Sequence, residues 1–215
     1  NYIDNDFFYK KASFISRIGS GSACRSVYGG INFWGKSSTF TEGSDFYSVE
    51  LTKNISSNFK NYKDTILIID DNKKDISSSI GHELMNNNPF SKLRFKEANN
   101  NISALMQILK SGDLFKFCEL VESEALMLHA LMMTSTPSYI LMKAQTLNVI
   151  NEIQRFRNLS KIPLCFTLDA GANVHILYPE KFSNDVTSFI VKKLSQFCVN
   201  EKFISDSVGK GPKQI

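Results

Sequence analysis

The chain has 215 residues and a net charge of +4, from 25 Lys and Arg against 21 Asp and Glu. Hydrophobic residues make up 42% of it and 17 residues are Phe, which excludes a disordered chain and allows a packed core. The charge is too small and dispersed to favour nucleic-acid binding, and the longest apolar stretch, 125–133, is too short to span a membrane. Four widely spaced cysteines exclude a zinc ribbon or redox motif and predict no disulfide framework, as in a cytoplasmic protein.

The first quarter of the chain predicts two helices and two strands. Apolar residues at helical spacing predict a helix over 6–18, with Gly19 as its stop signal. A short second helix follows the glycine and serine loop, and strands are predicted at 31–34 and 46–51. The chain opens at Asn1 without Met and runs almost at once into a helix, so we expect it to be part of a longer polypeptide.

A polar stretch then precedes an apolar, β-branched run at 65–70, which predicts a buried strand. We place the domain boundary there, with a first domain at 1–62 and a second at 63–215. From 77 to 157 the pattern is helical, with breaks near Pro89, Gly112 and Pro137.

Strand signals return at 164–168 and 174–178, on either side of a turn at 169–173, and predict a hairpin. A helix over 184–198 and a last strand at 203–205 follow. Strands and helices mix without strict βαβ alternation, so the predicted fold class is α+β.

The sharpest local motif is a glycine and serine loop that leads into a helix, Gly19-Ser20-Gly21-Ser22-Ala23-Cys24-Arg25-Ser26. Small residues let backbone amides approach an anion, and serine hydroxyls with an arginine complete an oxyanion cradle for phosphate or carboxylate. The alternative is a helix C-cap followed by an ordinary serine N-cap, and Arg25 shifts the balance toward an anion site.

Asp169 ends an apolar strand just before Gly171, with Thr167 and Asn173 nearby. A carboxylate there can orient or deprotonate a substrate hydroxyl. The more common role for such a residue is an Asx turn, in which the side chain bonds its own backbone.

A third segment, Lys73-Lys74-Asp75-Ile76-Ser77-Ser78-Ser79, is either an ordinary helix cap or a second anion contact. His82, His129 and His175 are isolated, and His82 lacks the second histidine of a zinc-protease helix. We predict no metal site in the chain and interpret His129 as a core histidine.

Together these motifs resemble the ATP-dependent diphosphomevalonate decarboxylases. The string GSGSACRSVYGGINFW carries most of the resemblance. It continues through Lys73-Lys74, Ser77-Ser78-Ser79, the Glu122–Ala125 region with His129-Ala130, and FTLDAGAN at 166–173. The family belongs to a superfamily of small-molecule kinases that includes galactokinase, homoserine kinase, mevalonate kinase and phosphomevalonate kinase.

The resemblance implies the remainder of an S5-like N-terminal domain at 1–62 and a helix-rich α+β domain with an antiparallel sheet at 63–215. It implies phosphorylation of the 3-hydroxyl of mevalonate 5-diphosphate with ATP and Mg²⁺, then loss of phosphate and CO2 to give isopentenyl diphosphate. Asp169 would be the catalytic carboxylate and Arg25 would hold the substrate carboxylate. Ser20, Ser22 and Ser78 would lie in the substrate-binding region.

The sequence departs from the family in three places. The family usually has Pro where Ala172 stands, and some bacterial members carry at Ser79 an arginine that touches the diphosphate. The family's N-terminal stretch, with a Lys-Tyr-Trp-like substrate segment and the Gly-Leu-Ala-Ser-Ser-type loop that cradles the ATP phosphates, is not found. We therefore expect a C-terminal portion that is inactive alone and needs that N-terminal segment as its partner.

Two other functions fit parts of the sequence. One is a mevalonate 3-kinase that does not decarboxylate, although Asp169 together with Arg25 favours the lyase. The other is a non-catalytic module that binds a diphosphate or forms a dimer, which would fit the absent ATP loop. The residues leave open whether the substrate carries one phosphate or two, and the oligomeric state, although dimers are common in the family.

Overall fold

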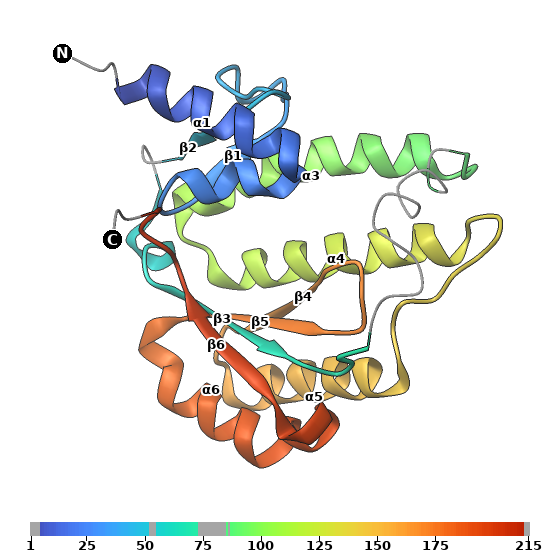
Figure 1. Cartoon of the computed structure of the whole chain (residues 1–215). Helices are drawn as coiled ribbons and strands as arrows, with labels where there is room; N and C mark the ends of the chain where they lie inside the picture. The colour runs from blue at the N-terminus through green and yellow to red at the C-terminus, as the bar shows by residue number, and fades with distance from the viewer. Residues whose placement is uncertain (1–4, 52–54, 73–84, 86, 213–215) are drawn as a thin grey trace. The chain divides into compact units, whose positions relative to one another are not determined.

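Figure 1 shows the computed structural model of the chain, which describes residues 5–51, 55–72, 85 and 87–212. The chain divides into two compact units, Asn1–Lys60 with Val208–Ile215 and Asn61–Ser207, and each is described here by itself. The assignment of 1–62 and 63–215 to two family domains stays a prediction. In the structure, the end of the chain returns to the first unit.

The first unit is built from helices and one small sheet: α1 (Asn5–Gly19), the 3₁₀ helix η1 (Gly21–Val27), β1 (Asn32–Trp34), β2 (Ser48–Glu50) and the 3₁₀ helix η2 (Ser57–Phe59). β1 and β2 pair antiparallel, with Phe33 opposite Val49. All the elements predicted from the first quarter of the sequence are present, because the apolar spacing there is regular and each segment ends at glycine or polar residues.

The second unit holds the larger sheet and the long helices. Its strands are β3 (Tyr62–Leu67), β4 (Cys165–Leu168), β5 (Val174–Pro179) and β6 (Phe203–Ser207). Its described helices are α3 (Ser91–Ser111), α4 (Leu114–Met133), α5 (Ala144–Ser160) and α6 (Ser183–Phe189), followed by short helical turns at Ile190–Leu194, Ser195–Phe197 and Val199–Glu201, with another before α6 at Glu180–Phe182.

The four strands form an antiparallel sheet in the order β4-β5-β3-β6. β4 and β5 make the predicted hairpin, with Leu168 opposite Val174. The predicted strand over 65–70 is misplaced by three residues, since β3 begins at Tyr62 and ends at Leu67. The polar residues Lys63 and Asp64 belong to the strand because β3 is central and pairs on both sides there.

Helices cover both faces of this sheet. In Figure 1, α4 lies on one side of it and α5 and α6 lie on the other, while α3 packs on α4. One core cluster joins the sheet to α5 and α6; it includes Leu67, Phe166, Val174, Ile176, Val149, Ile153, Val186 and Ile190. β4 is buried at three of its four residues, with only the polar Thr167 partly exposed, as expected for a strand covered on both faces.

The predicted helix breaks at Gly112 and Pro137 are confirmed, while most of the helical segment predicted before Pro89, residues 77–84 and 86, lies outside the described residues. Pro89 precedes α3, Gly112 ends α3 in the left-handed conformation with φ 79°, and Pro137 lies between α4 and α5. The prediction of one regular helix over 184–198 is wrong, since α6 is followed by a π turn and then by a 3₁₀ turn. Those turns bury Ile190 and Leu194 against the sheet, which keeps the apolar pattern while the hydrogen bonding changes.

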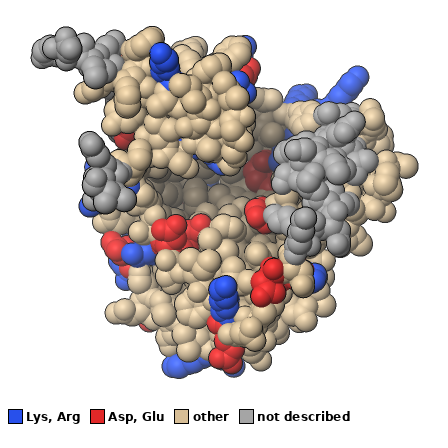
Figure 2. Space-filling model, viewed as in Figure 1, with Lys and Arg blue, Asp and Glu red and all other residues tan. Residues whose placement is uncertain are grey.

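The predicted α+β class is confirmed by this mixture of antiparallel sheets and helices. Within the described part of the chain, every helix is too short or too polar to cross a bilayer. On the face shown in Figure 2, basic and acidic side chains are interspersed among uncharged ones without a basic block. All four cysteines are buried free thiols, and burial raises the pKa of Cys198 to about 11.

Candidate functional site

The glycine and serine loop leads directly into η1, as predicted. Ser20 stands at the N-cap position in an extended conformation, φ −155° and ψ 127°, and its hydroxyl makes no capping hydrogen bond. The ordinary serine cap that the sequence left open is therefore not formed. Ser20, Ser22 and Arg25 are all exposed, so the polar groups of this segment are accessible to a ligand.

A buried cluster of hydroxyl groups fixes the residue before Arg25. Ser13 Oγ of α1 and Ser48 Oγ of β2 both donate to the carbonyl oxygen of Cys24, at 2.9 and 2.7 Å, and Ser48 N donates to Ser13 Oγ at 2.9 Å. Ser13, Ser48 and Cys24 are each 0% exposed. A buried, fully bonded polar network has one arrangement, so it sets the position from which Arg25 projects.

Close backbone packing holds both ends of this segment. At its start, a Cβ on Gly21 would stand 3.1 Å from the ring of Trp34, whose Nε1 donates to the Asp45 carbonyl at 3.1 Å. At its end, a Cβ on Gly29 would stand 2.8 Å from the backbone of Lys210. Glycine is therefore required at Gly29 for the close approach of the 208–212 segment, which Gly30 N secures with a 2.9 Å hydrogen bond to Gly209 O.

A cavity of about 560 Å³ opens beside Arg25 within the first unit. Ser26, Tyr28, Asn32 and Lys210 also line it. Among the described residues that line it, Arg25 and Lys210 are basic and none is Asp or Glu. The fixed charge of this cavity therefore favours an anionic ligand.

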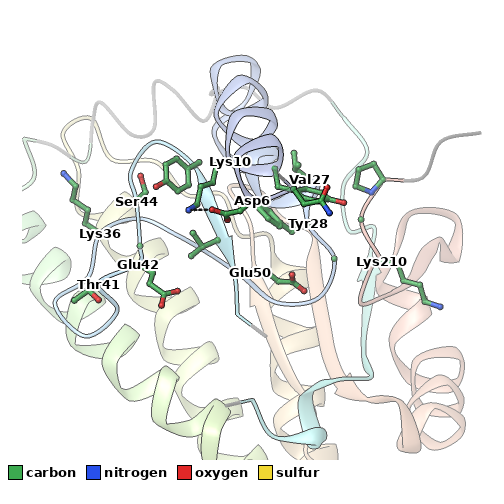
Figure 3. Close-up of a pocket in the computed structure, with 18 residues that line it drawn as sticks. Asp6, Lys10, Val27, Tyr28, Lys36, Thr41, Glu42, Ser44, Glu50 and Lys210 are labelled. Atoms are coloured by element: carbon green, nitrogen blue, oxygen red, sulfur yellow. Dashed lines mark hydrogen bonds and ion pairs between the residues drawn. The ribbon is translucent and has the colours of Figure 1, made fainter. Parts of the chain in front are cut away.

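A larger cavity of about 850 Å³ adjoins it in the first unit and shares Tyr28, Lys210, Gly211 and Pro212 of its lining (Figure 3). Its charged residues balance; they are Asp6, Glu42 and Glu50 against Lys10, Lys36 and Lys210. Figure 3 shows Asp6 and Lys10 paired with each other, at 2.7 Å between Oδ2 and Nζ, and Lys36 and Lys210 on opposite sides. With no excess of positive charge, this cavity is a poorer anion site than the smaller one.

Asp169 directly follows the last residue of β4, as the sequence predicts, and its side chain is exposed. Its backbone carbonyl accepts two hydrogen bonds, from Gly171 N at 2.8 Å and from His129 Nε2 at 3.1 Å. His129 belongs to α4 and is 1% exposed, which confirms the prediction of a core histidine. Burial lowers its pKa, so the ring is neutral near pH 7.

The far end of the same turn is tied to two other elements. Asn173 Oδ1 accepts from the backbone N–H groups of Ile69 and Asp70, at 2.8 and 3.0 Å. Thr146 Oγ1, at the start of α5, donates to the Ala172 carbonyl at 2.8 Å. Ala172, where the family usually has Pro, is 7% exposed and so packed in place without the proline ring.

Asp70 in turn forms an ion pair with Lys143, just before α5. The hydrogen bonds from Lys143 and Asn72 lower the pKa of Asp70 to about 2, so it is ionised at any physiological pH. The turn that carries Asp169 is thus connected to α4, to α5 and to the end of β3.

A buried ion pair secures β4, the edge strand that carries Asp169. Arg157 of α5 and Glu122 of α4 meet across this edge, with Nη2 and Oε2 2.8 Å apart. Arg157 Nη1 also donates to the Leu164 carbonyl at 2.9 Å, and Phe166 N donates to Glu122 Oε1 at 3.3 Å. The pair therefore satisfies backbone groups at the edge strand as well as each other.

The cross-strand pair His175 and Asp64 lies on β5 and β3, with Nδ1 and Oδ2 2.9 Å apart. The hydrogen bond to Asp64 raises the pKa of His175, and the negative charges of Asp64 and Asp169 add to the rise. The pKa of His175, on β5, therefore depends in part on the charge of Asp169, which follows β4.

The structure groups Ser20, Ser22 and Arg25 in the first unit and places Asp169 in the second. Ser78, with Lys73, Lys74, Ser77, Ser79 and His82, lies outside the described residues. A search of the described residues finds no group of three or more His, Cys, Asp and Glu side chains that would hold a metal ion.

The comparison with protein families decides what these motifs belong to. A family model described as the mevalonate 5-diphosphate decarboxylase C-terminal domain matches residues 65–215. The chain belongs to the mevalonate 5-diphosphate decarboxylase family. This match confirms the resemblance stated from the sequence.

Individual decarboxylases agree with this assignment. The chain is 26% identical to the diphosphomevalonate decarboxylase of Candida albicans, over 93% of this chain and 58% of that protein. The mevalonate diphosphate decarboxylase structure from Staphylococcus aureus is 26% identical, with a TM-score of 0.80 over 94% of this chain and 59% of its own. The MDDEF complex with MVAPP, AMPPCP and magnesium is also 26% identical, with a TM-score of 0.76 over 95% and 59%. The chain spans less than two thirds of the length of these decarboxylases.

The sequence did not single out the residues that hold the site residues in place. Ser13, Ser48 and Thr146 are small hydroxyl residues with no motif around them, and Glu122 and Arg157 are 35 positions apart. One indication of such residues was present in the sequence, because Glu122 and His129 lie in a segment that resembles the family. Their partners are brought together only by tertiary packing.

Proposed function

We propose that the complete protein to which this chain belongs is an ATP-dependent decarboxylase of mevalonate 5-diphosphate in isoprenoid biosynthesis. It would phosphorylate the substrate's 3-hydroxyl and then release phosphate and CO2 to give isopentenyl diphosphate. The observation that carries the proposal is the family match over 65–215 with an accessible Asp169 held at the end of β4 by two hydrogen bonds to its carbonyl.

In this proposal, Asp169 orients the 3-hydroxyl and accepts its proton. A tertiary alcohol is a weak acid, so a carboxylate within hydrogen-bond reach aids its attack on a phosphoryl group. A rigid turn supports this role because the carboxylate must be held in the reactive geometry.

We assign Arg25 to the substrate carboxylate and Ser20, Ser22 and Ser78 to substrate binding. Support for Arg25 comes from its cavity, whose described lining residues include two basic ones and no acidic one. Support for Ser20 comes from its hydroxyl, which is accessible and not used as a helix cap. A guanidinium fixes a carboxylate through paired hydrogen bonds, and the release of CO2 later removes that partner.

ATP and Mg²⁺ are the proposed cofactors, since the MDDEF structure holds AMPPCP and magnesium together with MVAPP. ATP would supply the phosphoryl group and Mg²⁺ would neutralise its charge. We assign no residue of this chain to either. The proposed partner is an N-terminal segment of the same protein that carries the phosphate-cradling loop, and a homodimer in the cytoplasm is the predicted assembly.

The test is turnover of the complete protein with ATP, Mg²⁺ and mevalonate 5-diphosphate labelled in its carboxylate. We expect release of phosphate and labelled CO2 in equal amounts. Phosphorylation without CO2 would identify a 3-kinase instead, and no product at all would support a non-catalytic module. The same assay with mevalonate 5-phosphate decides between one phosphate and two on the substrate.

Two variants test the residue assignments. Asp169→Asn should lower kcat by at least about 10²-fold, because the isosteric amide cannot take the proton. Arg25→Gln should raise KM by more than tenfold, whereas Lys36→Gln removes a charge from the balanced cavity and should leave KM within twofold. Equal effects of the Arg25 and Lys36 variants would overturn the assignment of Arg25.

A further inference from the structure

We propose that His129 is the positioning residue for Asp169, acting through a hydrogen bond from its Nε2–H to the Asp169 carbonyl. This inference rests on the proposed role of Asp169 and extends it to a residue that never touches the substrate. The hydrogen bond is 3.1 Å long and joins the C-terminal part of α4 to the turn after β4.

The hydrogen bond between the His129 ring and the Asp169 carbonyl determines which ring nitrogen carries the hydrogen. A backbone carbonyl can only accept a hydrogen bond, so Nε2 of His129 must carry the hydrogen. The ring is 1% exposed and burial lowers its pKa, so Nδ1 stays unprotonated. The lowered pKa favours the neutral ring, and the hydrogen bond places its one hydrogen on Nε2.

The contact controls the orientation of one peptide group. The Asp169 carbonyl accepts from Gly171 N at 2.8 Å as well as from His129, so its two acceptor positions are filled. Loss of the His129 bond would leave only the local contact within the turn. The peptide after Asp169 could then rotate and move the carboxylate, and a shift of about 1 Å in a reacting group can cost about 10²-fold in rate.

Other contacts of α4 hold this helix in place beside the turn. It carries Glu122, whose carboxylate pairs with Arg157 of α5 and accepts from Phe166 N of β4, and Ala125, which packs in the core. Two residues of α4 thus hold this part of the chain: Glu122 bonds to β4, and His129 bonds to the turn that carries Asp169. His129 is buried, as the sequence predicts for a core histidine, and in this proposal it also positions the Asp169 turn.

The test compares two substitutions in the complete protein. His129→Phe keeps a ring of similar size and removes the donor, whereas His129→Gln keeps an N–H donor at a similar reach. We expect His129→Phe to lower kcat by about 10- to 100-fold with KM within threefold, and His129→Gln to recover most of kcat. Equal kcat values for the two variants, or a kcat of His129→Phe within threefold of the parent, would refute the inference.

Two measurements on the 215-residue chain keep the inference independent of turnover. The ¹⁵N shifts of the His129 ring should show a protonated Nε2 and an unprotonated Nδ1 at pH 8, and the opposite tautomer would overturn it. Amide exchange of Gly171 should quicken by at least tenfold in His129→Phe and not in His129→Gln. If Asp169→Asn keeps normal turnover, the catalytic role of Asp169 fails, while the tautomer and the exchange rates still decide whether His129 fixes the turn.

Discussion

Breaking the ion pair between Glu122 and Arg157 from one side should be one of the most destabilising single changes in the second unit. Their side chains are 7% and 14% exposed, so neither charge has much access to water. Substitution Arg157→Met removes the guanidinium, leaves the Glu122 carboxylate buried without its ion partner, and removes the donor to the Leu164 carbonyl. Breaking a buried pair from one side costs about 3–5 kcal/mol, and we expect a loss in that range.

Urea unfolding of the chain, followed by circular dichroism, measures this loss. With a slope of about 2 kcal/mol per molar, the expected change lowers the midpoint by about 2 M. The matched control is Arg155→Met on the same helix, since Arg155 is 72% exposed and lies 3.8 Å from Glu152. An exposed pair of this kind contributes little, so the control should change stability by less than about 1 kcal/mol.

A double substitution separates the cost of the unpaired charge from the value of the pair. Glu122→Leu together with Arg157→Met leaves no buried charge, and we expect it to recover most of the stability lost in Arg157→Met. The reasoning is refuted if Arg157→Met loses less than about 1 kcal/mol, or if the double variant is less stable than Arg157→Met alone.

Three further predictions concern the turn and its surroundings. The raised pKa of His175, due first to its hydrogen bond with Asp64, stabilises the fold fully below the unfolded value of 6.5, and this contribution is lost as pH rises through the folded pKa. Unfolding free energy measured from pH 6 to pH 9 should show this fall, and a fall of equal size in Asp64→Asn would contradict it. Substitution Asn173→Ala leaves two backbone donors unpaired and should cost about 2–4 kcal/mol in urea unfolding, whereas Asn173→Asp keeps the acceptor and should cost less. Substitution Gly29→Ala places a Cβ 2.8 Å from the returning 208–212 backbone and should cost about 1–3 kcal/mol, while Gly19→Ala, whose Cβ meets nothing within 4 Å, should be nearly neutral; equal effects would refute the packing argument.

The sequence by itself determined the fold class, the order of the elements and the family. Helix spacing, the glycine at Gly112 and the turn at 169–173 are local signals, and the structure confirms each. The glycine and serine motif with Arg25, and Asp169 after its strand, could be recognised because each depends on neighbours in the chain. Local preferences act over a few residues, so they are readable without knowledge of the fold.

Only the tertiary structure decided how the strands outside the β4–β5 hairpin pair and what holds the site residues. β3 begins at Tyr62 rather than at residue 65 because β5 and β6 pair with it on both sides. His129 meets the Asp169 carbonyl across 40 positions, and Arg157 meets Glu122 across 35. A buried polar group must find a partner wherever the packing provides one, and no spacing rule along the chain states which residue that will be.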